Sequence, residues 1–235
     1  RFNPGMFITA GVLIVLGIIA ASITTGWLQF LIFISLLAAI ASLTISLVVS
    51  HWIYDKTDLY SLTSLEKCDP IENENWLTIN AGFDEITPTL KNQFPDINLR
   101  ILDFYDPEKH TEPSIARARK AYPPHPDTET ITSEHIPADD GSVEKIIAFF
   151  SLHEIRNHEE RVRIFRELHR VLTKSGELHL TEHLRNTPNL LAYNLGALHF
   201  HSRNTWLETF RESNFAIKSE VNTTPFITTF ILTKK

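Results

Sequence analysis

The chain has 235 residues, a formal net charge of −6 at neutral pH and a hydrophobic content of 43%. An acidic balance gives no electrostatic footprint for nucleic acid, and the single cysteine, Cys68, excludes an internal disulfide and a multi-cysteine zinc cluster. No Asp, Glu, Lys or Arg occurs between Phe2 and Tyr54. The sequence therefore joins one apolar module to one module of ordinary soluble composition, within a length that allows one or two domains.

Two apolar stretches make up the first module. Met6–Thr25 and Leu28–Ser50 each contain about 20 residues or slightly more, the length that a helix needs to cross ~30 Å of hydrocarbon. The turn Thr24–Trp27 separates them, and the aromatic residues after the second stretch suit the headgroup layer. We predict a transmembrane helical hairpin over residues 1–54, followed by a juxtamembrane connector over residues 55–75.

Three other interpretations of this module are weaker. A signal peptide has one short apolar core and a cleavage site, a single long helix would hold Gly26 in open water, and a buried pair of soluble helices is rarely apolar on every face. Small residues in both stretches permit close packing within a hairpin and between hairpins of a homo-oligomer, although lipid also simply tolerates them. They are Gly11, Gly17, Ala20, Ala21, Ala38, Ala39, Ala41 and Ser42.

The second module alternates strands with helices after a short helix at Leu59–Leu65. The expected strands are Trp76–Asn80, Leu99–Leu102, Thr128–Thr132, Lys145–Phe150, Glu177–Thr181, Ala216–Val221 and Ile227–Thr233. The expected helices are Ile86–Phe94, Ser114–Ala121, Glu159–Leu172, Asn189–Leu198 and Thr205–Ser213. Glu159–Leu172 has the clearest helical spacing of apolar residues, and Ser175-Gly176 is expected to stop it.

This alternation predicts an α/β fold with a doubly wound, mostly parallel seven-stranded sheet. The last two strands are joined by Asn222–Phe226, which is too short for a crossover helix, so they should pair antiparallel. The expected architecture is therefore a Rossmann-like sheet closed by a C-terminal antiparallel hairpin, preceded by the transmembrane α-hairpin. The terminal hairpin argues against a nicotinamide-binding domain.

Trp76 to Lys235 resembles a known family most specifically in the segment Asp140–His183. That segment has an acidic loop (DGSVE), a strand and His-containing turn (IIAFFSLHEI), and a helix that runs into RVLTKSG and another strand. In this order of features the chain resembles the class I S-adenosyl-L-methionine (SAM) dependent methyltransferases, in particular the ubiquinone/menaquinone-biosynthesis type. The resemblance implies SAM as the cofactor and methyl transfer (class EC 2.1.1) as the reaction.

The turn after the first strand departs from the family pattern of acidic-x-Gly-x-Gly-x-Gly. It reads TINAGFD over 78–84, so only Gly82 remains, with Asn80 and Asp84 at the other glycine positions. Glycines at such a turn let the backbone approach a ligand, and Asn80 tolerates positive φ better than most residues. The alternative is a turn that no longer binds a nucleoside.

The resemblance assigns the remaining cofactor contacts to strand ends. Asp103 ends the second strand, where an acid accepts hydrogen bonds from ribose hydroxyls, and the adjacent Phe104 or Tyr105 is placed to stack on adenine. Glu134 is the substitute for the acid that contacts the adenine amine. The candidate cofactor residues are Asn80, Ala81, Gly82, Asp103, Phe104, Ser133, Glu134 and Ser151.

Histidines and carboxylates after the fourth and fifth strands are the candidate catalytic groups. His153-Glu154 and Glu182-His183 lie at the carboxyl edge of the sheet, where α/β folds bind ligands, and His199 and His201 follow the helix that would cover that edge. A histidine oriented by a carboxylate is the usual general base. His199 and His201 have no third ligand on a predictable element, so no metal site is predicted.

These observations predict a membrane-anchored methyltransferase whose partners are the bilayer and a lipophilic small molecule such as a quinone or phenolic lipid, entering near Tyr193–His201. No nucleic-acid partner is expected. The domain should face the cytosol, where SAM is made, from the inner membrane in a bacterium. Two rivals remain: a catalytically inactive protein of the same fold that binds a ligand or partner, and a structural membrane protein assembled through its hairpins.

Overall fold

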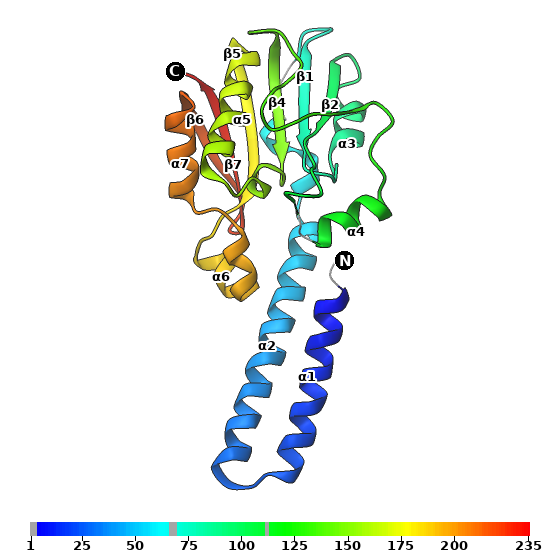
Figure 1. Cartoon of the computed structure of the whole chain (residues 1–235), viewed down its shortest axis with the longest axis vertical. Helices are drawn as coiled ribbons and strands as arrows, with labels where there is room; N and C mark the ends of the chain where they lie inside the picture. The colour runs from blue at the N-terminus through cyan, green and yellow to red at the C-terminus, as the bar shows by residue number, and fades with distance from the viewer. Residues whose placement is uncertain (1–3, 66–69, 111–112) are drawn as a thin grey trace.

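The computed structural model describes residues 4–65, 70–110 and 113–235 as a helical hairpin joined to an α/β domain (Figure 1). The hairpin consists of α1 (Pro4–Ile23) and α2 (Gly26–Lys56). Within these described ranges, the helical stretch Gly26–Ser61 is the one that is long and apolar enough, by length and composition, to cross a membrane; Phe7–Ile23 is a shorter apolar helix. Helix α2 therefore continues past the predicted span that ends at Ser50.

The two hairpin helices pack closely at one of the small residues. A methyl group added to Gly17 would lie 2.7 Å from a terminal carbon of Leu36, so the Leu36 side chain would have to move to accept it. At the turn, the side-chain amide of Gln29 donates to the backbone oxygen of Ala21 at 3.0 Å. The connection is thus fixed by packing along the helices and by a hydrogen bond at their ends.

The domain contains one seven-stranded sheet of order β3-β2-β1-β4-β5-β7-β6. The first five strands run parallel, and β7 pairs antiparallel with both β5 and β6. The strands are β1 (Asn75–Asn80), β2 (Asn98–Asp103), β3 (Thr128–Thr130), β4 (Val143–Phe149), β5 (Leu172–His183), β6 (Phe215–Thr224) and β7 (Ile227–Lys234). The predicted parallel sheet with its terminal antiparallel hairpin is confirmed, and its architecture is that of Rossmann-like methyltransferases.

Alternating residues of the central strands divide the core between the two faces of the sheet. Leu77 and Ile79 of β1 pack in a cluster with α5 (His158–Val171) and α7 (Arg203–Glu212). Trp76 packs on the other face with α3 (Thr87–Gln93), the end of α2 and two 3₁₀ turns, η1 (Leu59–Ser61) and η2 (Thr63–Leu65). The end of the long apolar helix therefore covers one face of the sheet.

Two elements differ from the predicted boundaries. Strand β5 begins at Leu172 instead of Glu177, because the carbonyls of Arg170 and Val171 accept hydrogen bonds from the 141–142 loop and end α5 there. The helix expected at Asn189–Leu198 is two pieces, α6 (Thr187–Tyr193) and the 3₁₀ helix η4 (Asn194–His199), divided at Asn194, which has a positive φ of 49°. The remaining elements are α4 (Pro113–Ala121) and the 3₁₀ turn η3 (Leu152–Glu154).

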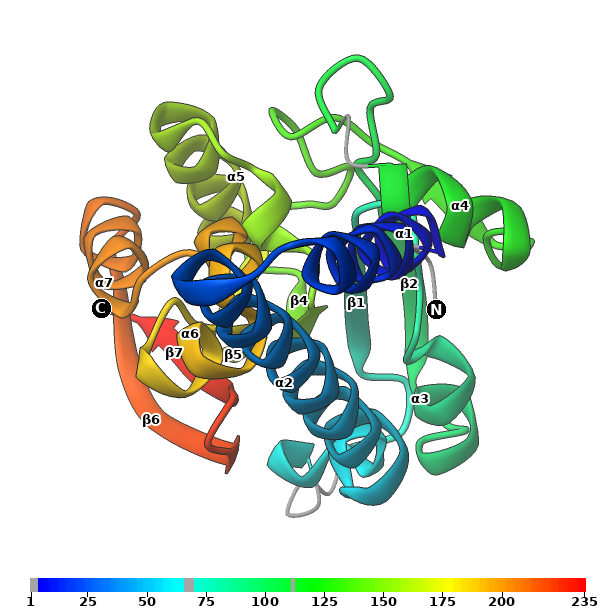
Figure 2. The same ribbon diagram turned by 90° about the horizontal axis from the view of Figure 1, so that it is seen from below.

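Helix α2 is docked onto the domain by direct contacts. Ile53 is fully buried, and the Tyr54 hydroxyl lies 2.8 Å from Nε2 of His183 at the end of β5. Farther down the helix, the side-chain amide of Asn194 donates to the Ser42 hydroxyl at 2.7 Å. The carboxyl ends of the parallel strands and the α6 region face the hairpin (Figures 1 and 2). A ligand at this edge would lie close to the hairpin.

Candidate active site

A cavity of about 130 Å³ lies at the carboxyl ends of β1 and β4. These two strands are the topological switch point, because the chain leaves β1 toward β2 on one side and returns to β4 on the other. Open α/β sheets bind ligands at such a point. The cavity is lined by Ala81, Phe83, Glu85, Ser114, Ile115, Ala118, Phe150, His153 and Glu154. A larger hollow of about 590 Å³ lies at the opposite edge, near Asn75 and Asn98.

The turn after β1 is tight at Gly82, which has a positive φ of 87°. A methyl group added there would lie 2.9 Å from the Tyr105 ring, so only glycine fits. Asp84, at another glycine position of the family pattern, accepts from the backbone amides of Ile86 and Thr87 and so caps the start of α3. The side-chain amide nitrogen of Asn80 is buried and has no hydrogen-bond partner among the described residues. Asn80 therefore offers a donor at the end of β1.

Asp103 is held by three donors. One carboxylate oxygen accepts from the backbone amides of Gly82 at 2.8 Å and Tyr105 at 2.9 Å, and the other accepts from the guanidinium of Arg119 on α4. The Asp103 side chain is 4% exposed. Arg119 also lies over the Tyr105 ring, 5.1 Å from its centroid. One of the two carboxylate oxygens predicted to bind a ribose is thus paired with an arginine, and Phe104 packs in the core instead of lining the cavity.

The other candidate cofactor residues are spread more widely. The buried Ser151 hydroxyl donates to the Ile79 carbonyl at 2.7 Å and joins the end of β4 to β1. Ser133 is also buried and donates to the carboxylate of Glu160, in the first turn of α5. Glu134 is exposed. The carboxylate that the structure places near Ser133 is therefore Glu160, whose amide is capped by Asn157 at 2.9 Å, a start signal that the sequence carries.

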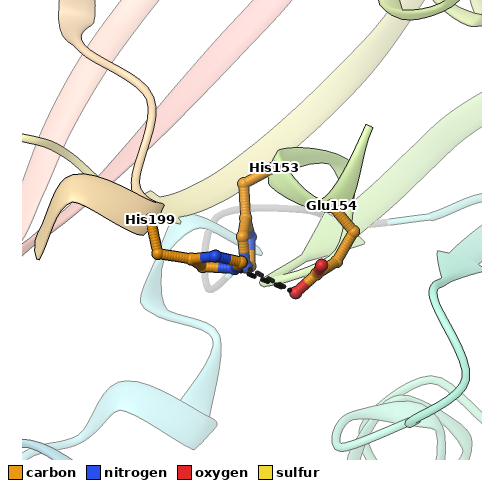
Figure 3. Close-up of side chains that lie close together, drawn as sticks. All are labelled: His153, Glu154 and His199. Atoms are coloured by element: carbon orange, nitrogen blue, oxygen red, sulfur yellow. Dashed lines mark hydrogen bonds and ion pairs between the residues drawn. The ribbon is translucent and has the colours of Figure 1, made fainter. Parts of the chain in front are cut away.

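Three of the candidate catalytic residues converge in one cluster: His153 and Glu154 of η3, and His199 at the end of η4 (Figure 3). One oxygen of Glu154 lies 3.2 Å from Nε2 of His153 and 3.2 Å from Nε2 of His199. On its other side, Nδ1 of His153 lies 2.7 Å from the carboxylate of the fully buried Glu182. A histidine–carboxylate pair is present here three times.

Two carboxylates set the protonation of His153. Burial by itself lowers the pKa of His153, but the negative charge of Glu182 and the hydrogen bonds with Glu154 and Glu182 raise it to about 10. Burial by itself raises the pKa of Glu154, but hydrogen bonds from His153 and His199 outweigh burial and hold this pKa well below its ordinary value. His153 is therefore an imidazolium at neutral pH in the metal-free protein, and Glu154 is a carboxylate.

The other two histidines lie outside this cluster. His183 is stacked between Phe150 and Phe200, and burial lowers its pKa to about 4. Its two nitrogens contact Tyr54 on one side and Asn189 and the Phe226 carbonyl on the other, so it joins the sheet to α2. His201 is buried against the ring of Trp206 and the guanidinium of Arg161, and burial followed by the Arg161 charge lowers its pKa to about 3.

Glu85 is a group at the cavity that the sequence did not single out. It follows the Gly82 turn, lines the cavity and accepts a hydrogen bond from the Tyr60 hydroxyl at 3.0 Å. Burial raises the pKa of Glu85 to about 7, against the opposing effect of the Tyr60 hydrogen bond. A carboxylate that titrates near neutrality beside a cavity is suited to proton transfer. Its position directly after the turn was the available signal.

Comparison with known proteins gives the decisive observation on the fold. Residues 107–180 match the model of a methyltransferase domain family, and the comparison with curated proteins finds no match. A SAM-dependent methyltransferase from Aquifex aeolicus superposes with a TM-score of 0.57 at 14% identity, covering 81% of this chain and 97% of that one. The chain has the class I methyltransferase fold.

Two further structures agree with this result. A methyltransferase of Haloferax volcanii, solved with the Trm112 activator, superposes with a TM-score of 0.52 at 12% identity, covering 82% of this chain and 96% of that one. LepI, solved with SAH and a substrate analogue, gives a TM-score of 0.51 at 10% identity over 74% of this chain and 46% of that one. Together the comparisons support SAM as the cofactor.

The residues at the edge of β1 and β2 fit such a cofactor in part. At the end of β1, the side-chain amide of Asn80 is a hydrogen-bond donor with no partner among the described residues, and the tight turn at Gly82 lets a ligand approach the backbone. Asp103 ends β2, the position predicted to bind a ribose, but one of its carboxylate oxygens pairs with Arg119. The cavity, at about 130 Å³, is smaller than the roughly 300 Å³ or more of ligand pockets. Ile115 and Ala118 of α4 line this cavity, and Arg119 of the same helix pairs with Asp103.

Proposed function

We propose that this chain is a membrane-anchored SAM-dependent methyltransferase, of class EC 2.1.1, that acts on a lipophilic small molecule. The fold, the methyltransferase match at 107–180 and the cavity at the switch point support the enzyme class. A cavity lined by Glu85, Glu154 and His153 supports acid–base chemistry at its wall.

The apolar hairpin supports the membrane location. Helix α2 has 31 residues, about 46 Å of helix, which is long enough to cross the hydrocarbon and still reach the sheet. Both ends of the hairpin lie on the side of the domain (Figure 1). Because SAM is a cytosolic metabolite, we infer that the domain faces the cytosol, from the inner membrane in a bacterium. Association of hairpins into a homo-oligomer is compatible with this arrangement.

The position of α6 and η4 is the observation that supports a lipophilic acceptor. Their leucines expose apolar surface, from 41% at Leu190 to 82% at Leu195. Asn194 is hydrogen-bonded to Ser42, which lies within the proposed span of α2. Exposed leucines at that depth are in a lipid environment instead of water. The same segment ends at His199, so one short element joins the bilayer to the histidine cluster.

Methyl transfer from a sulfonium needs alignment of the acceptor with the methyl group and exclusion of water. In the resulting scheme a hydroxyl acceptor enters along η4 and reaches the cavity between Phe150 and His153. Glu85 accepts the hydroxyl proton, because the raised pKa of its carboxyl lies near neutral pH. His153 orients Glu154 and cannot itself act as base while it is protonated. Hydroquinones and long-chain phenols fit these requirements.

The test is transfer of a radiolabelled methyl group. The full chain in nanodiscs is incubated with methyl-labelled SAM and a set of hydroquinones and alkylphenols, and organic-soluble label is counted. We expect labelled product from the wild type and a loss of roughly 10-fold or more in Asp103→Asn, which removes a charge-assisted hydrogen-bond acceptor. Absence of both labelled product and SAH binding would overturn the proposal.

A second candidate is a ligand-binding or interaction module without catalysis. The observation that favours it is the Asp103–Arg119 ion pair together with the small cavity. In that case calorimetry would show no heat with SAM or SAH even when Arg119 is replaced. The two candidates are therefore separated by binding before any acceptor is known.

A further inference from the structure

The histidine cluster has the arrangement of metal ligands. His153, Glu154 and His199 each direct one ligand atom inward, and these atoms all lie within 4.8 Å of one another (Figure 3). The two separations from the Glu154 oxygen are 3.2 Å each. Ligand atoms about 2.0–2.1 Å from one tetrahedral ion are about 3.3 Å apart. Two of the three separations therefore already match a bound ion, and the third, between the two histidines, lies within 4.8 Å.

Glu182 supplies the support that metal-binding histidines usually have. Its carboxylate lies 2.7 Å from Nδ1 of His153, and it also accepts from the His153 backbone amide at 3.2 Å. Glu182 is fully buried at the end of β5. When His153 is neutral, Glu182 keeps its proton on Nδ1, and the lone pair of Nε2 then faces Glu154 and His199. A carboxylate on the far nitrogen is the common outer-shell partner of a ligating histidine.

Arg156 holds the two ligand-bearing segments together. Its guanidinium donates to the backbone carbonyl of His199 and, at 3.4 Å, to that of His153. The two histidine rings meet edge to face, with centroids 5.2 Å apart. Because Glu154 and His199 are 45 residues apart in sequence, this contact brings the third ligand to the other two.

Charge and space also favour a cation. The imidazole of His153 lies between two negatively charged carboxylates, Glu154 and Glu182, and contacts both of them. A divalent ion on a neutral His153 neutralises both carboxylates. Glu154 and His153 line the 130 Å³ cavity, so an ion bound by them has a coordination position open to a ligand there. A site with three protein ligands and an open position is of the catalytic type.

We propose that His153, Glu154 and His199 bind one divalent transition ion of the Fe²⁺ to Zn²⁺ series, with Glu182 orienting His153. Two imidazoles and one carboxylate suit these ions better than Mg²⁺ or Ca²⁺, which prefer oxygen ligands alone. The sequence predicted no metal site, because His199 and His201 had no third ligand; in the structure His199 joins His153 and Glu154, and His201 packs on Trp206.

The role of the ion rests on the proposed function. A hydroxyl acceptor that coordinates the ion loses its proton to Glu85 and becomes an oxygen nucleophile. That oxygen forms a bond to the methyl carbon while the carbon–sulfur bond of SAM breaks, which leaves a methyl ether and the neutral thioether SAH. Charge and atoms balance, with no oxidant or reductant. The acceptor class narrows accordingly to hydroxyl compounds such as hydroquinones and phenols.

The test is metal binding in the absence of SAM and acceptor. The full chain, without a polyhistidine tag, is treated with a chelator in detergent and titrated with Co²⁺, followed by its visible absorption and by calorimetry. The variants are His199→Ala, Glu154→Gln and Glu182→Gln. The matched control is His158→Ala, which removes a histidine paired with Glu212 at 3.1 Å on the surface.

We expect one Co²⁺ per wild-type chain, with the absorption of a four- or five-coordinate ion. His199→Ala and Glu154→Gln should weaken binding at least about 100-fold and Glu182→Gln about 10- to 100-fold, while His158→Ala leaves it unchanged. Circular dichroism and SAH binding of the same samples show that the variants are folded. No Co²⁺ on the wild type, or equal binding by wild type and His199→Ala, would overturn the metal site. Since SAH binding is read separately, the methyltransferase proposal stands or falls independently.

Discussion

Replacement of Arg119 by Gln should strengthen the binding of SAM and SAH. In the structure the Arg119 guanidinium occupies one carboxylate oxygen of Asp103, the oxygen that a ribose hydroxyl needs. The arginine must leave before the nucleoside can bind. Asp103 keeps its other two donors, the backbone amides of Gly82 and Tyr105, in the variant, so the turn itself remains supported.

The size of the effect follows from the contact that is broken. A hydrogen bond between charged partners contributes about 1.5–3 kcal/mol, and the pair is only partly exposed, with side-chain exposures of 31% for Arg119 and 4% for Asp103. If ligand binding no longer has to break it, affinity should rise by about 10- to 100-fold, since each 1.4 kcal/mol is a factor of ten.

Isothermal titration of the detergent-solubilised chain with SAH and with SAM measures this change. Lys120→Gln, an exposed cation on the same helix, changes the net charge equally and should leave both affinities as they are. SAH carries no sulfonium charge, so an equal gain for SAH and SAM identifies release of Asp103 as the cause. If Arg119→Gln binds SAH as the wild type does, or more weakly, Arg119 is not the barrier and the reasoning is wrong.

Three further changes test other parts of the structure. Burial raises the pKa of Glu85 from 4.5 to about 7, so the folded protein holds this proton more tightly than the unfolded chain and loses stability as pH rises through that range. Glu85→Gln should remove roughly 2–3 kcal/mol of this pH dependence of unfolding, read from unfolding midpoints at pH 5 and pH 8. Ile53→Ala in the fully buried end of α2 should cost about 2–5 kcal/mol, against no loss for the exposed Ile45→Ala in the same melting assay. In a Cys68→Ser background, a fluorophore on Leu195→Cys should be quenched by brominated lipids in nanodiscs, whereas the same label on the exposed Glu108→Cys should not.

Most of the fold could be predicted because its signals are local. The second half of β4 (IIAF) is an apolar run, α5 carries helical spacing, and the link expected at Asn222–Phe226 leaves room only for an antiparallel return. The start of β5 could not be predicted, because it depends on the 141–142 loop binding the carbonyls at the end of α5, a contact between distant residues. The segment after α2 was expected to be a connector. Its leucines 59, 62 and 65 are instead buried under the sheet.

The candidate site was less accessible to sequence reasoning. Strand ends correctly indicated that His153 and Glu182 would lie at one edge, because parallel strands align their carboxyl ends. The third member of the cluster could not be predicted, because its position depends on η4, which begins at Asn194. In the structure His199 lies against Glu154, and His201 lies beside Trp206. Arg119 and Glu85 were missed because their importance comes from what they contact, and neither residue belongs to a motif.

The contacts of α2 argue that the hairpin does more than raise the local concentration of a membrane substrate. A flexible tether would leave the domain free to rotate, but α2 continues into the core at Ile53 and its Tyr54 contacts His183 directly. Glu182, the residue before His183 in β5, points to the opposite face of the strand and orients His153. One strand end therefore joins α2 to the histidine cluster. In the proposed membrane-anchored enzyme, α2 fixes the direction in which the cavity faces, and the exposed leucines of α6 and η4 lie on that side.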